Sequence, residues 1–538
     1  MITKSTNHAH IEAYPSPGKE KNEHIEVAES GPKTMVLSET QILSYGKNGI
    51  AGIVSSGYIF GIAFLASMGG FSFGYDQGVI SLILTMEQFH AQFPETAPGH
   101  PNQGFYVGFM TGMLELGAFL GCLVYPYVAG RWSRKWGLSF AVLWFCVGAI
   151  VQTAAQDYGM LVAGRTIGGV GVGTLALGAP LYISEISPPN LRGSLLVLET
   201  FSIVIGAVIA YWLTYGTAEI SSQWAFRLPF LLQMVPALMV GIGIHFFPFS
   251  PRWLCMRARN EEALSSLSTL RRLPSQDIRV QAEWRGIVAE VATMNEITYR
   301  KWGDATGLRL ELLGWKELFT AKYVRRTAVA AAIPFFQQFS GINAFVYYAP
   351  TLFRALGQDE HSSLVLSGMI NICQLVGACI IISCLDKVGR RKLAIFGGIA
   401  MGIPHAILAG LVARFNSSWQ DHPGPAWFGV ALIYFYVWPN SNRAKGVAMA
   451  VSVNWISNTI IGITVPPMIE SIGFGTYVFF ACFCFLATVF SFFFVPETAN
   501  LNLEEIDRLF RDNSAADEAE LQRELIVGLT TETTSGLK

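Results

Sequence analysis

The sequence predicts an all-α membrane protein made of two halves with six helices each. The first observation is composition: 51% of the 538 residues are apolar and only 14% are charged, whereas about 25% are charged in ordinary soluble domains. The second is that the apolar residues gather into twelve runs, most of which reach the roughly 20 residues that a helix needs to cross a bilayer. A soluble enzyme, a disordered chain and a nucleic-acid-binding protein are excluded, because charge is scarce and the net charge is −1.

The apolar runs form two series on either side of a polar stretch. The first series lies at 53–80, 105–128, 137–155, 159–184, 195–214 and 228–248. The second series lies at 327–354, 363–384, 393–414, 425–438, 445–470 and 474–495. Gly is frequent inside these runs, and small residues allow membrane helices to pack closely.

Loop charges predict the orientation of the helices. Residues 1–50 are polar and show no apolar signal-peptide segment, so we expect no cleaved leader. The loops at 130–135 and 386–391 are rich in Lys and Arg, whereas 84–104 and 415–424 contain neither residue. Basic loops stay on the cytoplasmic side. We therefore expect both termini in the cytoplasm and the protein in the plasma membrane.

The same pattern predicts five segments. We expect a disordered cytoplasmic N-terminus at 1–50 and a six-helix bundle at 51–250. A cytoplasmic linker with short helices at 251–326, a second helix bundle at 327–496 and a cytoplasmic tail at 497–538 are expected to follow. Apolar residues within 263–270 recur at helical spacing, although a solvated linker is an equally open interpretation. The eight Cys lie in or beside apolar runs without paired Cys-x-x-Cys spacing. We expect no metal and no other cofactor.

The two halves echo each other. A basic loop follows the second helix of each half, G-R-W-S-R-K at 130–135 and D-K-V-G-R-R at 386–391. A basic site also precedes each fifth helix, at 191–193 and 443–446. Parallel six-helix repeats are typical of transporters that rock around a site at the bilayer midplane. The repeat favours a transporter over a channel or a membrane enzyme.

Six motifs, in a fixed order, carry a family resemblance. They are F-G-Y-D-Q-G at Phe73–Gly78, G-R-x-x-x-G-x-G-x-G at Gly164–Gly173, P-x-Y-x-x-E-x-x-P-x-x-x-R-G at Pro180–Gly193, S-P-R-W-L at Ser250–Leu254, Q-Q-x-x-G-I-N-x-x-x-Y-Y at Gln337–Tyr348, and P-E-T with L-E-E-I-D at Pro496–Asp507. Over residues 55–510 the chain resembles the sugar porter family of the major facilitator superfamily, and most closely its fungal monosaccharide transporters. The resemblance implies the major facilitator fold, in which two six-helix bundles are related by pseudo-two-fold symmetry, and transport of a hexose or pentose.

One carboxylate, Asp76, lies inside an apolar run, and Arg165 in another run is its expected partner. A charge at the bilayer centre costs about 2.5–3.5 kcal/mol on insertion scales. Removal from water disfavours the charged form of a carboxylate, so such a group can take up a proton near neutral pH. The resemblance likewise implies a proton-coupling role for this pair. Two observations weigh against it: a carboxylate near a helix end can be hydrated, and Gln233 stands where some proton-linked relatives carry Glu.

Amides and hydroxyls inside the runs predict the sugar site, because an amide both donates and accepts hydrogen bonds and can pair with a polyol. Interhelical hydrogen bonding is the alternative use of buried amides. The resemblance carries sugar binding onto these positions, with the tyrosines gating or stacking from the outer side. The candidates are Gln337, Gln338, Asn343, Asn371, Asn454, Tyr347, Tyr348 and Thr200. The fifth helix departs from the family, because Thr200 and Ala207, with Glu199 beside the first, stand where many sugar porters carry Gln.

Charged residues at the expected cytoplasmic helix ends predict a gate of ion pairs. Exposed pairs contribute about 0–1 kcal/mol each, but several that break together can set the balance between two states. The candidates are Glu185, Arg192, Asp386, Arg390 and Arg391. Gly130 stands at or near the place of a family acid, which predicts a weaker clamp in the first half. Asn416 opens a glycosylation sequon that we expect to be unused, because it lies close to the membrane.

The tenth run is the least regular feature. Its 13 apolar residues, Ala426 to Trp438, span about 20 Å as a helix, short of the roughly 30 Å hydrocarbon core. Compared with the family, about twenty residues are missing before Arg443, including a tryptophan and a cytoplasmic glutamate. We expect a truncated or distorted helix that leaves the second half open on that side. We also expect poor transport, or a mis-spliced product of a working gene.

Four functions remain open at this stage. The favoured one is a monomeric transporter of a hexose or pentose coupled to protons, with sugar, H⁺ and the lipid bilayer as its partners and no nucleic acid. A facilitative uniporter can keep similar residues. The altered fifth helix leaves room for an exporter of a secondary metabolite. A sugar sensor that does not transport is less favoured, because only 42 residues follow Pro496.

Overall fold

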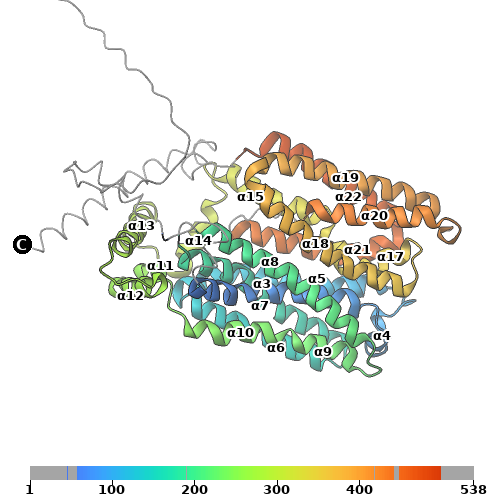
Figure 1. The fold of residues 1–538 in the computed structure, drawn as a ribbon, viewed down its shortest axis with the longest axis horizontal. Helices are drawn as coiled ribbons and strands as arrows, with labels where there is room; N and C mark the ends of the chain where they lie inside the picture. Colours follow the sequence, from blue (N-terminus) through green and yellow to red (C-terminus); the bar gives the residue numbers. More distant parts are fainter. Residues whose placement is uncertain (1–44, 46–56, 189–190, 417, 441–447, 498–538) are drawn as a thin grey trace, which may run out of the picture. The chain divides into compact units, whose positions relative to one another are not determined.

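The computed structural model describes residues 45, 57–188, 191–416, 418–440 and 448–497. Regular secondary structure in these residues is entirely helical (Figure 1). The helices of the first half and its short connections are α3 Gly57–Ile83, α4 Glu87–Gln92, η1 Pro94–Thr96, α5 Gln103–Arg131, α6 Arg134–Ala154, α7 Tyr158–Ile186, α8 Arg192–Ala218, α9 Trp224–Leu232, α10 Met234–Gly243 and η2 Ile244–Phe246.

A group of shorter helices follows, and then the second half. The shorter helices are α11 Pro251–Met256, α12 Asn260–Arg271, α13 Ile278–Trp302 and α14 Gly307–Glu317. The second half contains α15 Val324–Phe339, α16 Ile342–Tyr347, α17 Ala349–Ala355, α18 Glu360–Val388, α19 Arg390–Phe415, η3 Trp419–Asp421, α20 Pro423–Asn440, α21 Ala448–Ile472 and α22 Phe474–Phe494. All twelve apolar runs are thus helical where the structure describes them, which confirms the predicted all-α class.

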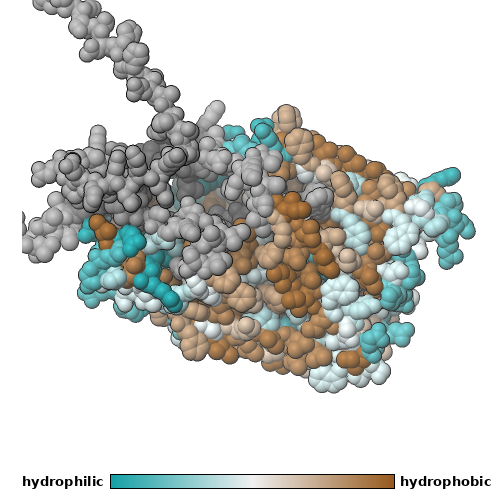
Figure 2. Space-filling view, viewed as in Figure 1, coloured by the Kyte–Doolittle hydropathy of each residue, from teal (hydrophilic) through white to brown (hydrophobic). Residues whose placement is uncertain are grey.

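Nine helices of the described residues are long and apolar enough to cross a membrane. Many large apolar side chains on them are exposed, among them Leu143, Ile242 and Phe493 at 61%, 63% and 70%. Figure 2 shows hydrophobic residues over the middle of the helices and hydrophilic residues toward their ends. An apolar surface of this extent indicates contact with lipid. We call the two ends of the helices the α4 end and the α11 end, after the short helices that lie there (Figure 1).

Small residues let the long helices approach closely. Gly74 of α3 packs on α8 so tightly that an added Cβ would lie 1.8 Å from the carbonyl oxygen of Ile203. Glycines on α5 and α7 make similar contacts across that pair of helices. Since lipid and apolar side chains are equally hydrophobic, such close backbone contact replaces the hydrophobic effect as a source of helix association.

Two of the membrane runs are broken into consecutive helices. The sixth is divided at Gln233, where α9 ends and α10 begins. The seventh is divided at Gly341, which separates α15 from α16 with a φ of 92°. A side chain at Gly341 would be strained by that φ, and its Cβ would also meet the ring of Phe480 at 2.9 Å. The break turns α16 relative to α15 and brings the polar residues of both into one region.

The tenth run forms α20, which has 18 residues from Pro423 to Asn440. At 1.5 Å per residue it is about 27 Å long, so it is longer than the apolar run alone predicts. Its neighbours α19 and α21 have 26 and 25 residues. The junction where the missing segment is expected, including Arg443, lies outside the described residues. Truncation of the tenth helix therefore stays a prediction.

Candidate functional site

A buried ion pair joins α3 to α7. Asp76 and Arg165 are 2% and 1% exposed. Arg165 donates from Nη1 and Nη2 to the two carboxylate oxygens of Asp76 at 3.4 and 3.3 Å. Its Nε donates to the carbonyl oxygen of Met110 on α5 at 3.0 Å. The structure thus brings together the two membrane charges that the sequence predicts as partners, and their side chains tie three helices of the first half.

A chain of amides runs through the second half. Asn343 donates from Nδ2 to Oε1 of Gln338 at 2.7 Å, across the break between α15 and α16. Gln338 in turn donates from Nε2 to Oδ1 of Asn454 on α21 at 2.7 Å. Gln338 and Asn343 are 0% and 2% exposed. Three of the predicted sugar-site amides therefore form one continuous hydrogen-bonded chain.

Gln77 connects this chain to the first half. It follows Asp76 on α3 and is 5% exposed. Its Nε2 donates to the hydroxyl of Tyr347 at 3.3 Å and makes a long contact of 3.5 Å with Oδ1 of Asn343. Sequence reasoning missed Gln77, although it lies in the F-G-Y-D-Q-G motif beside the predicted proton site. A polar residue adjacent to Asp76 in the same apolar run was the available signal.

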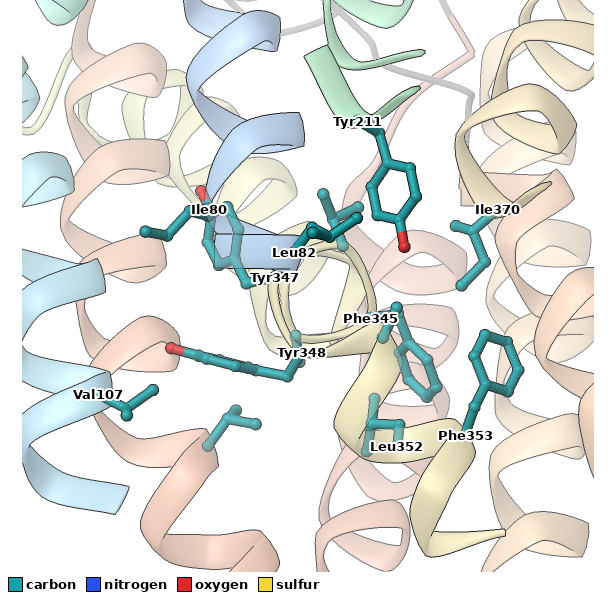
Figure 3. Packing of buried hydrophobic residues seen from close by; sticks show 14 of the residues in the cluster. Ile80, Leu82, Val107, Tyr211, Phe345, Tyr347, Tyr348, Leu352, Phe353 and Ile370 are labelled. Atoms are coloured by element: carbon teal, nitrogen blue, oxygen red, sulfur yellow. The ribbon is translucent and has the colours of Figure 1, made fainter. Parts of the chain in front are cut away.

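Tyr347 forms a second bridge between the halves. Its hydroxyl donates to the carboxylate of Glu115 on α5 and accepts from Nδ2 of Asn458 on α21 at 3.1 Å. Glu115 and Asn458 are 1% and 0% exposed. Figure 3 shows Tyr347 and Tyr348 projecting from α16 on the side away from Phe345.

Sequence reasoning also missed Glu115 and Asn458. Glu115 is a lone carboxylate in the apolar run at 105–128, so the argument that selected Asp76 applies equally to it. Asn458 lies one helical turn after Asn454, and i, i+4 spacing places both on one face of α21. Both residues could have been found from the sequence, but their contact with Tyr347 could not.

The other predicted sugar-site residues lie around this network. Tyr348 is buried and donates its hydroxyl to the carbonyl oxygen of Gly462 at 2.8 Å. Buried polar atoms of Gln337 (Nε2) and Asn371 (Oδ1) have no hydrogen-bond partner among the described residues. Thr200 lines a cavity of about 40 Å³ together with Gln77 and Asn343. That volume holds a few water molecules at most, so a sugar would have to displace side chains or be admitted by movement of the halves.

A family comparison decides what kind of protein this is. Residues 62–510 match the family model described as "Sugar (and other) transporter". The chain belongs to this sugar transporter family. The match agrees with the resemblance carried by the six motifs.

Individual relatives and solved structures agree with the sugar transporter family. The chain is 30% identical to a "High-affinity glucose transporter" of Kluyveromyces lactis, over 85% of this chain and 86% of the relative. It is 31% identical to a "Probable quinate permease" of Aspergillus niger, over 84% and 88%. Among solved structures it is similar to the proton:xylose symporter XylE bound to 6-bromo-6-deoxy-D-glucose, with a TM-score of 0.67 and 26% identity over 85% and 99%. The major facilitator fold is thereby confirmed.

Charged residues at the α11 end of this sugar transporter are arranged within each half. Glu185 on α7 accepts from Nε and Nη2 of Arg134 on α6, with a shortest distance of 2.7 Å. Arg192 is exposed at the start of α8. The backbone N–H of Arg391 donates to the carboxylate of Glu497 at 3.2 Å, and its side chain donates to the carbonyl oxygen of Phe492. The side chains of two further predicted gate residues, Asp386 and Arg390, lie outside what the structure describes.

Two remaining expectations concern modification and metal binding. Asn416 is exposed at the C-terminal end of α19, and its glycosylation state stays a prediction. Across the described residues, no group of three or more His, Cys, Asp or Glu side chains could hold a metal ion.

Proposed function

We propose that this protein transports a monosaccharide, a hexose or a pentose, together with a proton by alternating access. The observation that carries the proposal is the polar network that joins the halves. It runs from Gln77 of α3 through Asn343 and Gln338 to Asn454 of α21. An uncharged polyol needs paired donors and acceptors in a buried site, and amides supply both.

The amide chain is the proposed sugar site. In this arrangement Gln338, Asn343 and Asn454 satisfy one another. Sugar hydroxyls can replace these contacts one for one, so the buried amides do not remain without partners when the sugar leaves. Gln337 and Asn371 add buried polar atoms that have no partner in the described structure. An orphaned buried polar atom costs about 1–3 kcal/mol, and a sugar hydroxyl would relieve that cost.

Proton coupling is proposed for Asp76. Protonation would remove the negative charge that faces Arg165 at 3.3 Å and would weaken the tie between α3 and α7. Asp76 is adjacent in sequence to Gln77, which contacts Tyr347 and Asn343. A change in the position of this turn of α3 would therefore reach the proposed sugar site directly. The similarity to XylE, which is a proton:xylose symporter, supports the same coupling.

Alternating access is supported by where the halves touch. Near the α4 end, Tyr211 of α8 donates its hydroxyl to the carbonyl oxygen of Leu364 on α18 at 2.6 Å. Tyr215 contacts Nε2 of His361 at 3.2 Å in the same region. We propose that the α4 end faces the outside and is closed in this arrangement. Both termini are then cytoplasmic, and the membrane is proposed to be the plasma membrane.

A gate at the α11 end is the remaining part of the proposal. The pair Arg134–Glu185 is nearly buried, at 9% and 5% side-chain exposure, and lies within the first half. Arg391 and Glu497 lie together at the corresponding end of the second half. We propose that these clusters hold each half rigid while the halves rock against each other. Gly130 supplies no carboxylate to the first cluster, so we expect the clamp in the first half to be the weaker of the two.

Uptake by the full chain tests the proposal. A yeast strain that lacks hexose transport would express the protein and receive radiolabelled hexoses, pentoses and quinate, with and without a protonophore. Accumulation of a monosaccharide that the protonophore abolishes is the expected result. Sugar uptake that the protonophore leaves unchanged would make the protein a uniporter. Absence of sugar uptake, with efflux of a preloaded polyol acid, would favour the exporter that the altered fifth helix and the quinate-permease relatives leave open.

A further inference from the structure

A groove of about 820 Å³ opens on the molecular surface at the α11 end. It lies where the last turn of α5, the first three turns of α6 and the short helix α11 meet. The polar network of the proposed sugar site does not contribute to its lining. The groove is therefore separate from the transport site and needs its own explanation.

Arginine side chains contribute positive charge to the lining of the groove. Arg131 and Arg257 line it and have no carboxylate within ion-pair distance in the described part of the chain. Arg257 donates from Nη2 to the carbonyl oxygens of Gly130 and Arg131 at 3.0 and 2.5 Å, and its guanidinium lies 5.9 Å from the ring of Trp253. A third arginine, Arg259, is paired with Glu262 at 2.5 Å. Among the residues that the structure describes, two positive charges thus have no acidic partner, and one of them is held in place by its hydrogen bonds.

Most of the remaining lining residues are aromatic or apolar. Trp132 and Trp136 are 54% and 53% exposed, and Leu143 is 61% exposed. Trp136, Phe140 and Leu143 follow one another at i, i+4 and i+7 on α6, so they form one stripe along its face. The stripe leads from the arginines about 10 Å along the helix toward the hydrophobic middle. Indole rings are enriched where a membrane meets water.

We propose that this groove binds one anionic glycerophospholipid of the adjacent leaflet. The phosphate group would lie between Arg131 and Arg257, and an acyl chain would follow Phe140 and Leu143. An amphiphile is required because the groove combines unpaired cations with an apolar stripe. A free phosphate ion would leave the stripe uncovered, and a zwitterionic lipid would neutralise only part of the charge.

Native mass spectrometry of the purified full chain tests this site. The protein in detergent is given equal amounts of phosphatidylglycerol and phosphatidylcholine, and the lipid retained per protein is counted. An arginine near an anionic headgroup contributes about fivefold in affinity, so replacing both arginines should lower retention roughly twenty- to thirtyfold. The variant is Arg131→Gln with Arg257→Gln. The matched control is Arg285→Gln with Arg300→Gln on α13, which removes the same charge outside the groove.

The expected result is preferential retention of phosphatidylglycerol by the wild type and the control, and its loss in the groove variant. Equal retention of the two lipids by the wild type overturns the proposal, as does full retention by the groove variant. Displacement of the lipid by 10 mM inorganic phosphate would assign the cations to a free ion and also overturns it. If the double variant does not fold, Leu143→Trp is the second variant, because the larger side chain narrows the part of the groove proposed for the acyl chain and leaves the charge unchanged. Undiminished retention by that variant would refute the site.

Discussion

Replacing Tyr347 with Phe removes one hydroxyl at the junction of the halves. That hydroxyl donates to Glu115 and accepts from Gln77 and Asn458. In the described part of the chain, the other carboxylate oxygen of Glu115 has no hydrogen-bond partner, so the variant leaves a buried carboxyl group without its tyrosine donor. Hydrogen bonds to charged groups contribute about 1.5–3 kcal/mol. We expect the variant to destabilise the present arrangement by about 2 kcal/mol relative to an arrangement that is open at the α4 end. The ratio of the two populations would then shift roughly thirtyfold toward the open arrangement.

Distance measurements between spin labels would detect this change. Suitable positions are Ala91 on α4 and Arg414 near the end of α19, which are exposed on the two halves near the α4 end. The exposed Cys379 and Cys482 would be replaced first. We expect a new, longer distance to become populated in Tyr347→Phe, together with a changed KM for sugar uptake.

Tyr434→Phe is the matched control. It also removes one tyrosine hydroxyl, but that hydroxyl donates to the carbonyl oxygen of Leu366 at 2.8 Å, a contact between α20 and α18 within the second half. The control should therefore leave the distance distribution unchanged. If both variants behave like the wild type, the contact between Tyr347 and Glu115 does not hold the halves together. If both open equally, the effect is general loss of packing within the second half, and the reasoning is also refuted.

Four further predictions follow from the same structure. Asp76→Asn should abolish accumulation against a gradient and keep part of the sugar exchange, and concentrative uptake by this variant would exclude Asp76 as the proton site. Gln338→Ala should raise the KM for sugar at unchanged surface expression, whereas a loss of expression alone would make the amides structural. Ser133→Gly should stabilise the detergent-solubilised protein against thermal unfolding by about 1–2 kcal/mol, because Ser133 has a φ of 122° and a ψ of 164°, a region that costs a non-glycine residue about 1–3 kcal/mol. The variant also loses the capping hydrogen bond to Trp136, but replacing a capping Ser with Gly costs only about a few tenths of a kcal/mol. A lower melting temperature would show that the capping bond matters more than the backbone strain. Inserting the segment that the family carries after Asn440 should raise uptake, or a longer transcript should contain it, whereas full uptake by the 538-residue chain would show that the short tenth helix works as it stands.

The fold class and the kinds of residue in the site could be predicted from the sequence alone. Composition and run length are properties of the local chain, and the cost of burying polar groups in a bilayer makes them reliable. Each of the twelve runs is helical where described. The same argument selected Asp76 and the amides, because a charge or amide in an apolar run requires a partner.

Which of these residues contact one another depends on the packing of the helices and could not be predicted from the sequence. Asp76 and Arg165 are separated by 89 residues, and Glu115 and Tyr347 by 232. Helical periodicity reaches a few turns and cannot pair residues on different helices. The break at Gly341 sets the direction of α16, and the close contact of Gly74 with Ile203 sets the position of α3 against α8, so both contribute to which polar groups face one another. That is why Asp76 could be selected from the sequence, whereas the bridge from Glu115 through Tyr347 to Asn458 became visible only in three dimensions.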